Sequence, residues 1–442
     1  MMKRSSGSVP RRLAGLSVAL ALLLGGCQPP ASTPAVPPAA APAATKPAEA
    51  AKPAEVAKPA DAAKPAASGE PIRIGFSDAM SGGLGGLGSD QSRGGELAVE
   101  EIKTLLGRPV EWVARDDKND PGEATKQAEQ LVANDKVSVL TGCVSAATTL
   151  AINQVAKRAQ IVYLGTCQTN NLNDAKKDWS EYTFHFALSP WMNNQMVMPW
   201  IFDNLGKKMY VIAADYAWGN ENLESIQKWL TTKNVQTVGQ VKTPFPTADF
   251  TTFIPQVRAT TPEVVITVLP GADYTNFMKQ ASQFGVTKET KLYAPVVDVP
   301  FDQATGQEII AGSYGGANFH FSLAEKLPSA RAFVESFEKK FNAKPSGYAS
   351  YQYNAVKAWA AAVEKAGSLD QKKIAENLRG AKFDYSSGPA FVRACDNQIF
   401  QTVHIMVGRK ETQGTSGYRD FVLSIEPDEK YERTCEELGH KS

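Results

Sequence analysis

Short apolar segments that alternate with helical segments constrain the fold of this chain more than any other feature. Apolar runs at 72–76, 137–140, 161–164, 209–213 and 264–268 are each followed by a helical pattern or a loop. Strands of this kind, separated by helices, predict parallel sheets with both faces covered. The expected fold is therefore doubly wound α/β, in which ligands bind at the carboxyl ends of the strands.

The α/β pattern covers more of the 442-residue chain than one doubly wound domain usually occupies. We therefore expect two Rossmann-like lobes with a ligand between them. The pattern ends in β-rich segments at 390–408 and 421–425, which suggests that the chain crosses back between the lobes through a multi-strand hinge. The predicted lobe 1 comprises residues 72–187 and 317–400, and the predicted lobe 2 comprises residues 188–316 and 401–438.

The first 26 residues have the pattern of an export signal. Two basic pairs, Lys3–Arg4 and Arg11–Arg12, precede an apolar run at 13–24 that is too short to span a bilayer. The segment Leu24-Gly25-Gly26-Cys27 resembles a bacterial lipobox, in which the cysteine becomes the lipidated first residue of the mature protein. Residues 1–26 are thus the expected signal peptide and Cys27 the expected lipid anchor, with plain secretion as the alternative. The predicted location is the periplasm or the cell surface.

Residues 27–70 are expected to form a spacer between the lipid and the folded body. Ala, Pro and Lys dominate their composition, and a six-residue unit recurs at Lys46, Lys52 and Lys58. A repeat this short and this poor in large apolar side chains cannot bury a core, and it favours extended, partly polyproline II structure. The folded body is therefore expected to begin near residue 71.

The charge balance excludes one class of partner. The chain has 47 Lys and Arg against 46 Asp and Glu, a formal net charge of +1. This leaves no basic excess to neutralise a phosphate backbone, so nucleic acid is not an expected partner. No later segment has the roughly 18 uninterrupted apolar residues of a membrane helix, so membrane association is expected to depend on lipid at Cys27.

Four cysteines follow Cys27, and an even number in an exported protein favours disulfides. Three pairings are possible, and we expect Cys143–Cys167 and Cys395–Cys435. The first two cysteines lie just past consecutive predicted parallel strands, which are about 4.8 Å apart in a sheet. The second pair would hold the C-terminal tail. No CxxC motif occurs and the four histidines are scattered, so no metal site is expected.

Two motifs resemble catalytic or cofactor sites. The segment 83–88 satisfies GxGxxG, with Asp116 and Asp117 after the second strand, as in dinucleotide-binding folds. Several residues separate these glycines from the strand, however, so we expect a flexible loop that covers a ligand, and no cofactor. The segment 75–79 approximates a nucleophile elbow around Ser77, but a glycine-rich segment follows where the elbow needs a helix. An exported hydrolase therefore remains only an alternative, and the chain is not expected to be an enzyme.

Several segments together carry a family resemblance. Residues 78–82 after the first strand, Asp116–Pro121 after the second and Asp215–Gly219 after the strand at 209–213 are similar to those of periplasmic leucine/isoleucine/valine-binding proteins. These are type I solute-binding proteins of ABC transporters. The resemblance implies a monomer that captures a small molecule between two lobes and delivers it to an ABC permease in the membrane. A ligand-dependent sensor for a membrane receptor is an alternative with the same sequence features.

The resemblance also implies how the first lobe grips a ligand carboxylate, with hydroxyl and backbone N–H groups at two strand-to-helix junctions. These junctions are residues 142–146 and 165–169 here, and the second includes Gln168. Thr169 matches the threonine of the family. Ser145 stands one residue before the usual serine position, and Ala146 occupies that position.

From the second lobe, the resemblance makes Trp218 the aromatic residue that covers the ligand. Leu87, Tyr348 and Tyr351 are further candidates for the lid. The acidic residue that pairs with a ligand ammonium is replaced by Val296, and Asp298 could substitute only if the loop register shifts by two. The expected ligand is therefore similar to a branched-chain amino acid, or is a carboxylate, amide or aromatic acid without an α-amino group.

Overall fold

The computed structural model describes residues 69–233, 235–410 and 417–441. All described residues belong to one compact unit, which lies within Pro65–Ser442. The expected signal peptide, the lipidation site at Cys27 and nearly all of the expected spacer at 27–70 lie outside the described residues. Within the described part of the chain, no helix is both long and apolar enough to cross a membrane.

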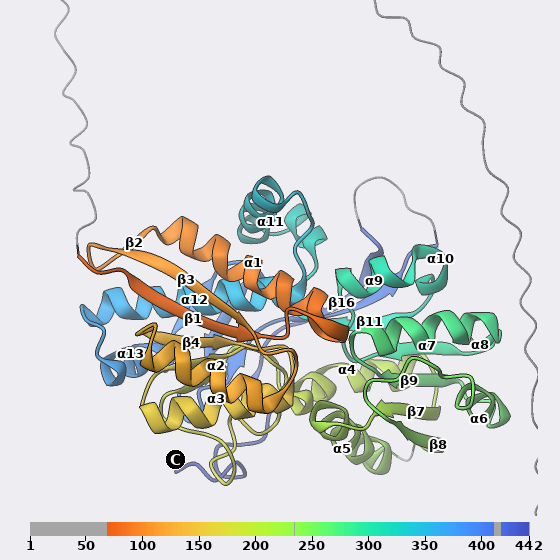
Figure 1. Cartoon of the computed structure of the whole chain (residues 1–442). Coiled ribbons are helices and arrows are strands. Elements are labelled where there is room, and N and C mark those ends of the chain that lie inside the picture. Colours follow the sequence, from red (N-terminus) through yellow and green to blue (C-terminus); the bar gives the residue numbers. More distant parts are fainter. Residues whose placement is uncertain (1–68, 234, 411–416, 442) are drawn as a thin grey trace, which may run out of the picture. The chain divides into compact units, whose positions relative to one another are not determined.

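Lobe 1 is built on a six-stranded sheet, which lies on the left in Figure 1. Its strands, in spatial order, are β2 (Thr104–Leu105), β3 (Arg108–Asp116), β1 (Ile72–Asp78), β4 (Val139–Gly142), β5 (Tyr163–Gly165) and β6 (Thr183–His185). All neighbours are parallel except the short hairpin pair β2–β3. The sheet has the doubly wound order that the alternating pattern predicts.

Helices cover both faces of this sheet. On one face α1 (Gly85–Ile102) packs against α12 (Gly347–Ala366), with α11 (Pro328–Phe341) and α13 (Gln371–Leu378) beside them. On the other face α2 (Pro121–Ala133) packs against α3 (Ala146–Ala159). Consecutive strand residues alternate between the two cores: Val139 belongs to the first core and Leu140 to the second.

Lobe 2 is built on a seven-stranded sheet, on the right in Figure 1. Its spatial order is β16 (Arg419–Ile425), β15 (Val403–Gly408), β11 (Tyr314–Ala317), β10 (Lys291–Ala294), β9 (Val264–Val268), β7 (Lys208–Ala214) and β8 (Gln236–Thr243). The strands from β11 to β8 are parallel, and β15 and β16 are antiparallel. Its helices are α4 (Pro190–Asn204), α5 (Ala217–Thr232), α6 (Ile254–Ala259), α7 (Gly271–Gln283), α8 (Val286–Glu289), α9 (Val299–Thr305) and α10 (Gln307–Ile310).

The chain passes between the two sheets three times, after β6, after β11 and after β14 (Ile399–Phe400). The strand β14 belongs to a small antiparallel sheet with β12 (Lys382–Asp384) and β13 (Pro389–Val392). Two doubly wound lobes joined by several crossings confirm the predicted fold class.

The glycine-rich segment at 83–88 is ordered as helix, and the expected flexible loop is wrong. A short 3₁₀ turn, η1 (Gly82–Leu84), leads directly into α1, which begins at Gly85. A Cβ atom on Gly88 would lie 2.2 Å from the carbonyl oxygen of Ala79. Glycine is therefore required there because the first turns of α1 press against the end of β1.

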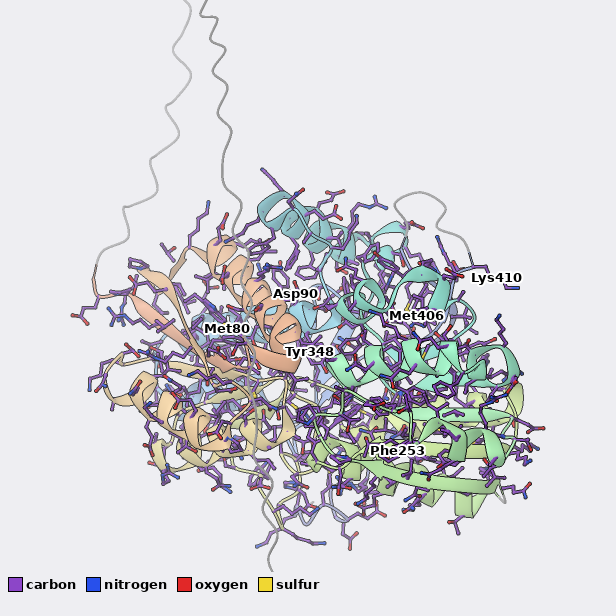
Figure 2. The ribbon with its side chains drawn as sticks, turned by 45° about the vertical axis from the view of Figure 1, so that its right-hand side comes forward. Met80, Asp90, Phe253, Tyr348, Met406 and Lys410 are labelled. Atoms are coloured by element: carbon purple, nitrogen blue, oxygen red, sulfur yellow. A yellow bond between two sulfur atoms is a disulfide. The ribbon has the colours of Figure 1, made fainter. Side chains whose placement is uncertain are left out.

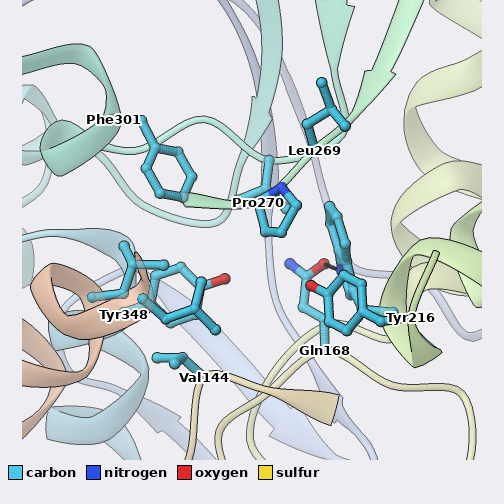
Figure 3. Close-up of a pocket in the computed structure, with 11 residues that line it drawn as sticks. Val144, Gln168, Tyr216, Leu269, Pro270, Phe301 and Tyr348 are labelled. Atoms are coloured by element: carbon cyan, nitrogen blue, oxygen red, sulfur yellow. Dashed lines mark hydrogen bonds between the residues drawn. The ribbon is translucent and has the colours of Figure 1, made fainter. Parts of the chain in front are cut away.

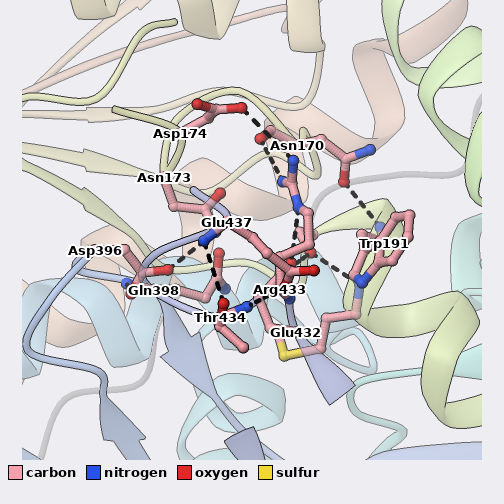
Figure 4. Close-up of polar contacts among 12 residues, drawn as sticks. Asn170, Asn173, Asp174, Trp191, Asp396, Gln398, Glu432, Arg433, Thr434 and Glu437 are labelled. Atoms are coloured by element: carbon pink, nitrogen blue, oxygen red, sulfur yellow. Dashed lines mark hydrogen bonds and ion pairs between the residues drawn. The ribbon is translucent and has the colours of Figure 1, made fainter. Parts of the chain in front are cut away.

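One of the expected disulfides is present among the described residues. Cys395 and Cys435 are bonded, with 6.1 Å between their Cα atoms. Two residues before Cys435, the Arg433 guanidinium donates to the carbonyl of Asn170 at 3.0 Å and to the carboxylate of Glu432 at 3.3 Å. Figure 4 shows Arg433 between these two partners. The tail is thus fastened beside the loop that follows β5.

Cys143 and Cys167 are free, buried thiols, so the expected bridge between them is wrong. The strands β4 and β5 are adjacent, and Gly142 pairs with Gly165. Cys143 lies one position past the paired glycines and Cys167 lies two positions past, and an odd offset turns two side chains to opposite faces of a sheet. Cys143 accordingly packs in the core of α2 and α3, and Cys167 packs in the core of α4 and α5.

Candidate functional site

A narrow cavity lies where the carboxyl ends of the strands of both lobes meet. Figure 3 shows its wall, and Figure 2 places Tyr348 where the two lobes meet. The wall is formed by Leu84, Leu87, Val144, Gln168 and Tyr348 from lobe 1 and by Tyr216, Trp218, Leu269, Pro270, Val296 and Phe301 from lobe 2. Except for Tyr348, near the start of α12, each of these residues follows a strand end, as in other doubly wound folds.

Four aromatic side chains contribute to the wall beside six aliphatic ones. Tyr216 and Trp218 come from the start of α5, with 6.1 Å between their ring centroids. Tyr216 also stacks on Phe245 at 4.4 Å, which holds its ring in place. Tyr348 packs edge-on against Tyr351, behind the wall, at 6.2 Å. Such rings offer a large apolar area to a ligand body, with hydroxyl groups at their edges.

The polar groups that face the cavity are neutral. Figure 3 shows the hydroxyl groups of Tyr216 and Tyr348 and the amide nitrogen of Gln168 directed toward the open space. The amide oxygen of Gln168 accepts a hydrogen bond from the Trp218 indole nitrogen at 3.2 Å, a contact between the two lobes. Burial raises the pKa of the Tyr216 and Tyr348 hydroxyls well above the ordinary value, so both remain protonated.

At the first junction, the carboxylate of Asp78 holds the backbone. Asp78 ends β1 and is fully buried, and its Oδ1 accepts from the backbone N–H groups of Ala79 at 2.7 Å and Val144 at 2.8 Å. Its Oδ2 has no hydrogen-bond partner among the described residues. Burial raises the pKa of Asp78 well above its ordinary value, and the nearby Asp117 carboxyl raises it further.

At the second junction, a carboxylate from lobe 2 binds lobe 1. Glu221 lies one turn after Trp218 on α5. Its Oε1 accepts from the Thr169 hydroxyl at 2.9 Å, and its Oε2 accepts from the backbone N–H of Asn170 at 2.8 Å. Burial raises the pKa of Glu221 to about 7. Glu221 was not predicted as a site residue, although its helical spacing from Trp218 places both side chains on one face of α5.

Asp298 links the two lobes away from the cavity wall. It is the N-cap of α9, and its Oδ1 accepts from the Val299 backbone N–H at 2.7 Å. Both carboxylate oxygens also lie 3.0 Å from the backbone N–H of Gly347, at the start of α12 in lobe 1. Burial raises the pKa of Asp298 to about 7. Val296, two residues earlier, lines the cavity.

The predicted site residues therefore fall into two groups. Leu87, Gln168, Trp218, Val296 and Tyr348 line the cavity, whereas Ser145, Ala146, Thr169, Asp298 and Tyr351 are buried behind the wall. Six wall residues were not predicted, namely Leu84, Val144, Tyr216, Leu269, Pro270 and Phe301. Their positions after strand ends are the signal that could have identified them.

The arrangement around Ser77 does not support hydrolysis. Ser77 is buried within β1, and its hydroxyl donates to the carboxylate of Asp117 at 3.5 Å. In the described part of the chain, no group of three or more His, Cys, Asp or Glu side chains could hold a metal ion.

Comparison with known proteins places this fold and cavity in a family. The family model described as periplasmic binding protein matches residues 71–413. The chain belongs to this family. A relative, Leu/Ile/Val-binding protein homolog 7 of Brucella abortus, is 25% identical over 330 residues, which are 70% of this chain and 80% of the relative.

Solved structures of periplasmic binding proteins share the fold. A periplasmic binding protein from Burkholderia mallei has a TM-score of 0.77 at 24% identity, covering 83% of this chain and 97% of its own. A solute binding protein of an ABC transporter from Rhodopseudomonas palustris, in complex with 3,4-dihydroxybenzoic acid, has a TM-score of 0.74 at 21% identity, covering 80% of this chain and 97% of its own. The predicted resemblance to type I periplasmic binding proteins is thereby confirmed.

Proposed function

We propose that this protein captures a small organic solute in the cavity between its lobes and delivers it to an ABC permease in the membrane. The observation that carries the proposal is the wall itself, to which both lobes contribute strand-end side chains. A ligand that contacts both lobes stabilises the arrangement in which they are closed upon it. The protein then needs only differential affinity for the closed and open forms, and no catalysis.

Contacts between the lobes support a closing motion. The Trp218–Gln168 hydrogen bond and the Glu221 contacts with Thr169 and Asn170 join α5 of lobe 2 to the loop after β5 of lobe 1. These contacts break if the lobes separate, so they favour the closed form together with the ligand. A permease that recognises only the closed form would receive loaded protein selectively.

The ligand has an apolar body and lacks an α-amino group. Val296 stands where the resemblance expects an acid, and of the eleven described wall residues none has a carboxylate. An ammonium group would thus be buried without a counter-charge on the wall, which is unfavourable. One structural neighbour is described in complex with 3,4-dihydroxybenzoic acid, a small ligand that has no amino group.

Export and anchoring complete the proposal. Residues 1–26 would direct secretion, lipid at Cys27 would hold the protein on a membrane, and the spacer at 27–70 would let the folded unit reach the permease. Metabolic labelling with a fatty acid tests the anchor: label that persists in Cys27→Ser would contradict it.

A thermal-shift screen tests the capture of a solute. The purified protein is heated with branched-chain amino acids, organic acids, amides and aromatic acids. A ligand at 100 times its dissociation constant adds about 2.7 kcal/mol of stability, which raises the melting temperature measurably. Leucine or valine as the best ligand would contradict the interpretation of Val296, and the absence of any stabilising solute would contradict the proposed function.

A further inference from the structure

The cavity offers no counter-charge to an ionised ligand. All eleven described residues of its wall have uncharged side chains. The groups that face the open space are two phenol hydroxyls and one amide nitrogen, which are neutral hydrogen-bonding groups (Figure 3). A carboxylate placed there would be desolvated without a cation to pair with it, which costs several kcal/mol.

Backbone and hydroxyl donors beside the cavity are already bound to carboxylates of the protein itself. The N–H of Val144, a wall residue, donates to Asp78. At the other junction the Thr169 hydroxyl and the Asn170 N–H donate to Glu221. Asp78 and Glu221 are 0% and 9% exposed, so neither carboxylate is turned toward solvent.

We infer that the cavity selects an uncharged ligand, a neutral amide or alcohol on an apolar body, because Asp78 and Glu221 occupy the donors that would otherwise bind a ligand carboxylate. This inference rests on the proposed function and specifies its ligand class. Glu221 is then the residue that excludes ligand carboxylates. Gln168, Tyr216 and Tyr348 are the residues that form hydrogen bonds with the uncharged polar group of the ligand.

Pairs of compounds that differ only in charge test the inference on the wild-type protein. Isovaleramide is compared with isovalerate and 3-methylbutylammonium, and benzamide is compared with benzoate and benzylammonium, by calorimetric titration at pH 7.5. We expect the amide of each set to bind at least about tenfold tighter than its charged analogues, since burying an unpaired charge costs more than 1.4 kcal/mol.

Variants on helix α5 test the role of Glu221. In Glu221→Ala the Thr169 and Asn170 donors are freed and one buried charge is removed, so the preference for isovaleramide over isovalerate should fall by at least about tenfold. Glu221→Gln keeps the volume and removes only the charge, and it should lower the preference by a smaller factor. Glu224→Ala, at an exposed position of the same helix, is the matched control and should leave the preference unchanged.

The outcomes separate this inference from the proposed function. Carboxylates or ammonium compounds that bind as tightly as the amides would overturn the inference and leave solute capture intact. A wild-type preference for amides that persists unchanged in both Glu221 variants would overturn the role of Glu221. If none of the six compounds binds, the charge of the best ligand from the broader screen decides: an uncharged ligand supports the inference and an ionised one overturns it. A broader screen without any ligand contradicts the proposed function itself.

Discussion

Buried carboxylates in this protein have two kinds of partner, either a cation or neutral hydrogen-bond donors. Inside lobe 2, Asp302 forms a two-pronged ion pair with Arg419 at 2.7 Å for both contacts, and the side chains are 1% and 0% exposed. Between the lobes, Glu221 and Asp298 accept hydrogen bonds from neutral backbone and hydroxyl donors. The first arrangement balances a buried charge and holds one lobe together, whereas the second leaves carboxylates that can change protonation where the lobes meet.

The largest effect is expected from removing the cation of the first group. Arg419→Leu leaves Asp302 buried and unpaired, so the free energy of unfolding should fall by about 3–5 kcal/mol. Denaturant titration measures the loss. Arg258→Leu is the matched control, because Arg258 makes the same two-pronged contact with Glu289 on the surface and should cost less than about 1 kcal/mol. Equal losses in both variants would remove the distinction between buried and exposed pairs.

The second prediction concerns the contribution of Asp298 to the pH dependence of the free energy of unfolding. Its pKa is about 7 in the folded protein against an ordinary 3.8, so between these values the folded state keeps a proton that the unfolded chain has lost. Rising pH therefore favours unfolding. Between these two pKa values, the free energy of unfolding of the wild type should fall by about 1.4 kcal/mol per pH unit relative to that of Asp298→Asn. Taking the difference from the variant cancels the opposite contribution of the buried histidines, whose pKa values are lowered by burial. A stability difference that is constant from pH 5 to pH 7 would show that Asp298 does not titrate there.

The third prediction concerns the pH dependence of ligand choice. Protonation of Glu221, whose pKa is about 7, removes one negative charge from the second junction. Lys177 and Arg433 are the cations that act on it. Isovalerate should therefore bind up to about tenfold tighter at pH 6 than at pH 8 in wild type, and isovaleramide should not change. The same gain for isovalerate in Glu221→Gln would assign the effect to another group.

The smallest effect is expected from a neutral contact between the lobes. Trp218→Phe keeps an aromatic ring on the wall but removes the indole N–H that donates to Gln168. The unfolding free energy should fall by about 0.5–1.5 kcal/mol, measured by denaturant titration at pH 7. A loss as large as that of Arg419→Leu would mean that Trp218 acts mainly through core packing, and the contrast between the two regions would weaken.

Much of the cavity wall could be predicted because it depends on local order along the chain. Trp218 and Val296 follow the strands at 209–213 and 291–294, and residues that follow parallel strands share one edge of a sheet. The same rule applies to Tyr216 and Phe301, which also follow the ends of these strands. The Cys143–Cys167 bridge was wrong because adjacency of strands was judged without the register that sets side-chain direction.

By itself, the sequence determined the order of strands and helices, the two-lobe α/β class and the strand ends from which the wall is built, because these follow from periodicity over a few residues. Only the tertiary structure decided which donors remain available to a ligand. Glu221 and Thr169 are 52 residues apart, and Asp78 and Val144 are 66 apart. Asp78 meets Val144 only after lobe 1 has folded, and Glu221 meets Thr169 only after both lobes have folded and come together, so no local pattern of residues encodes either contact.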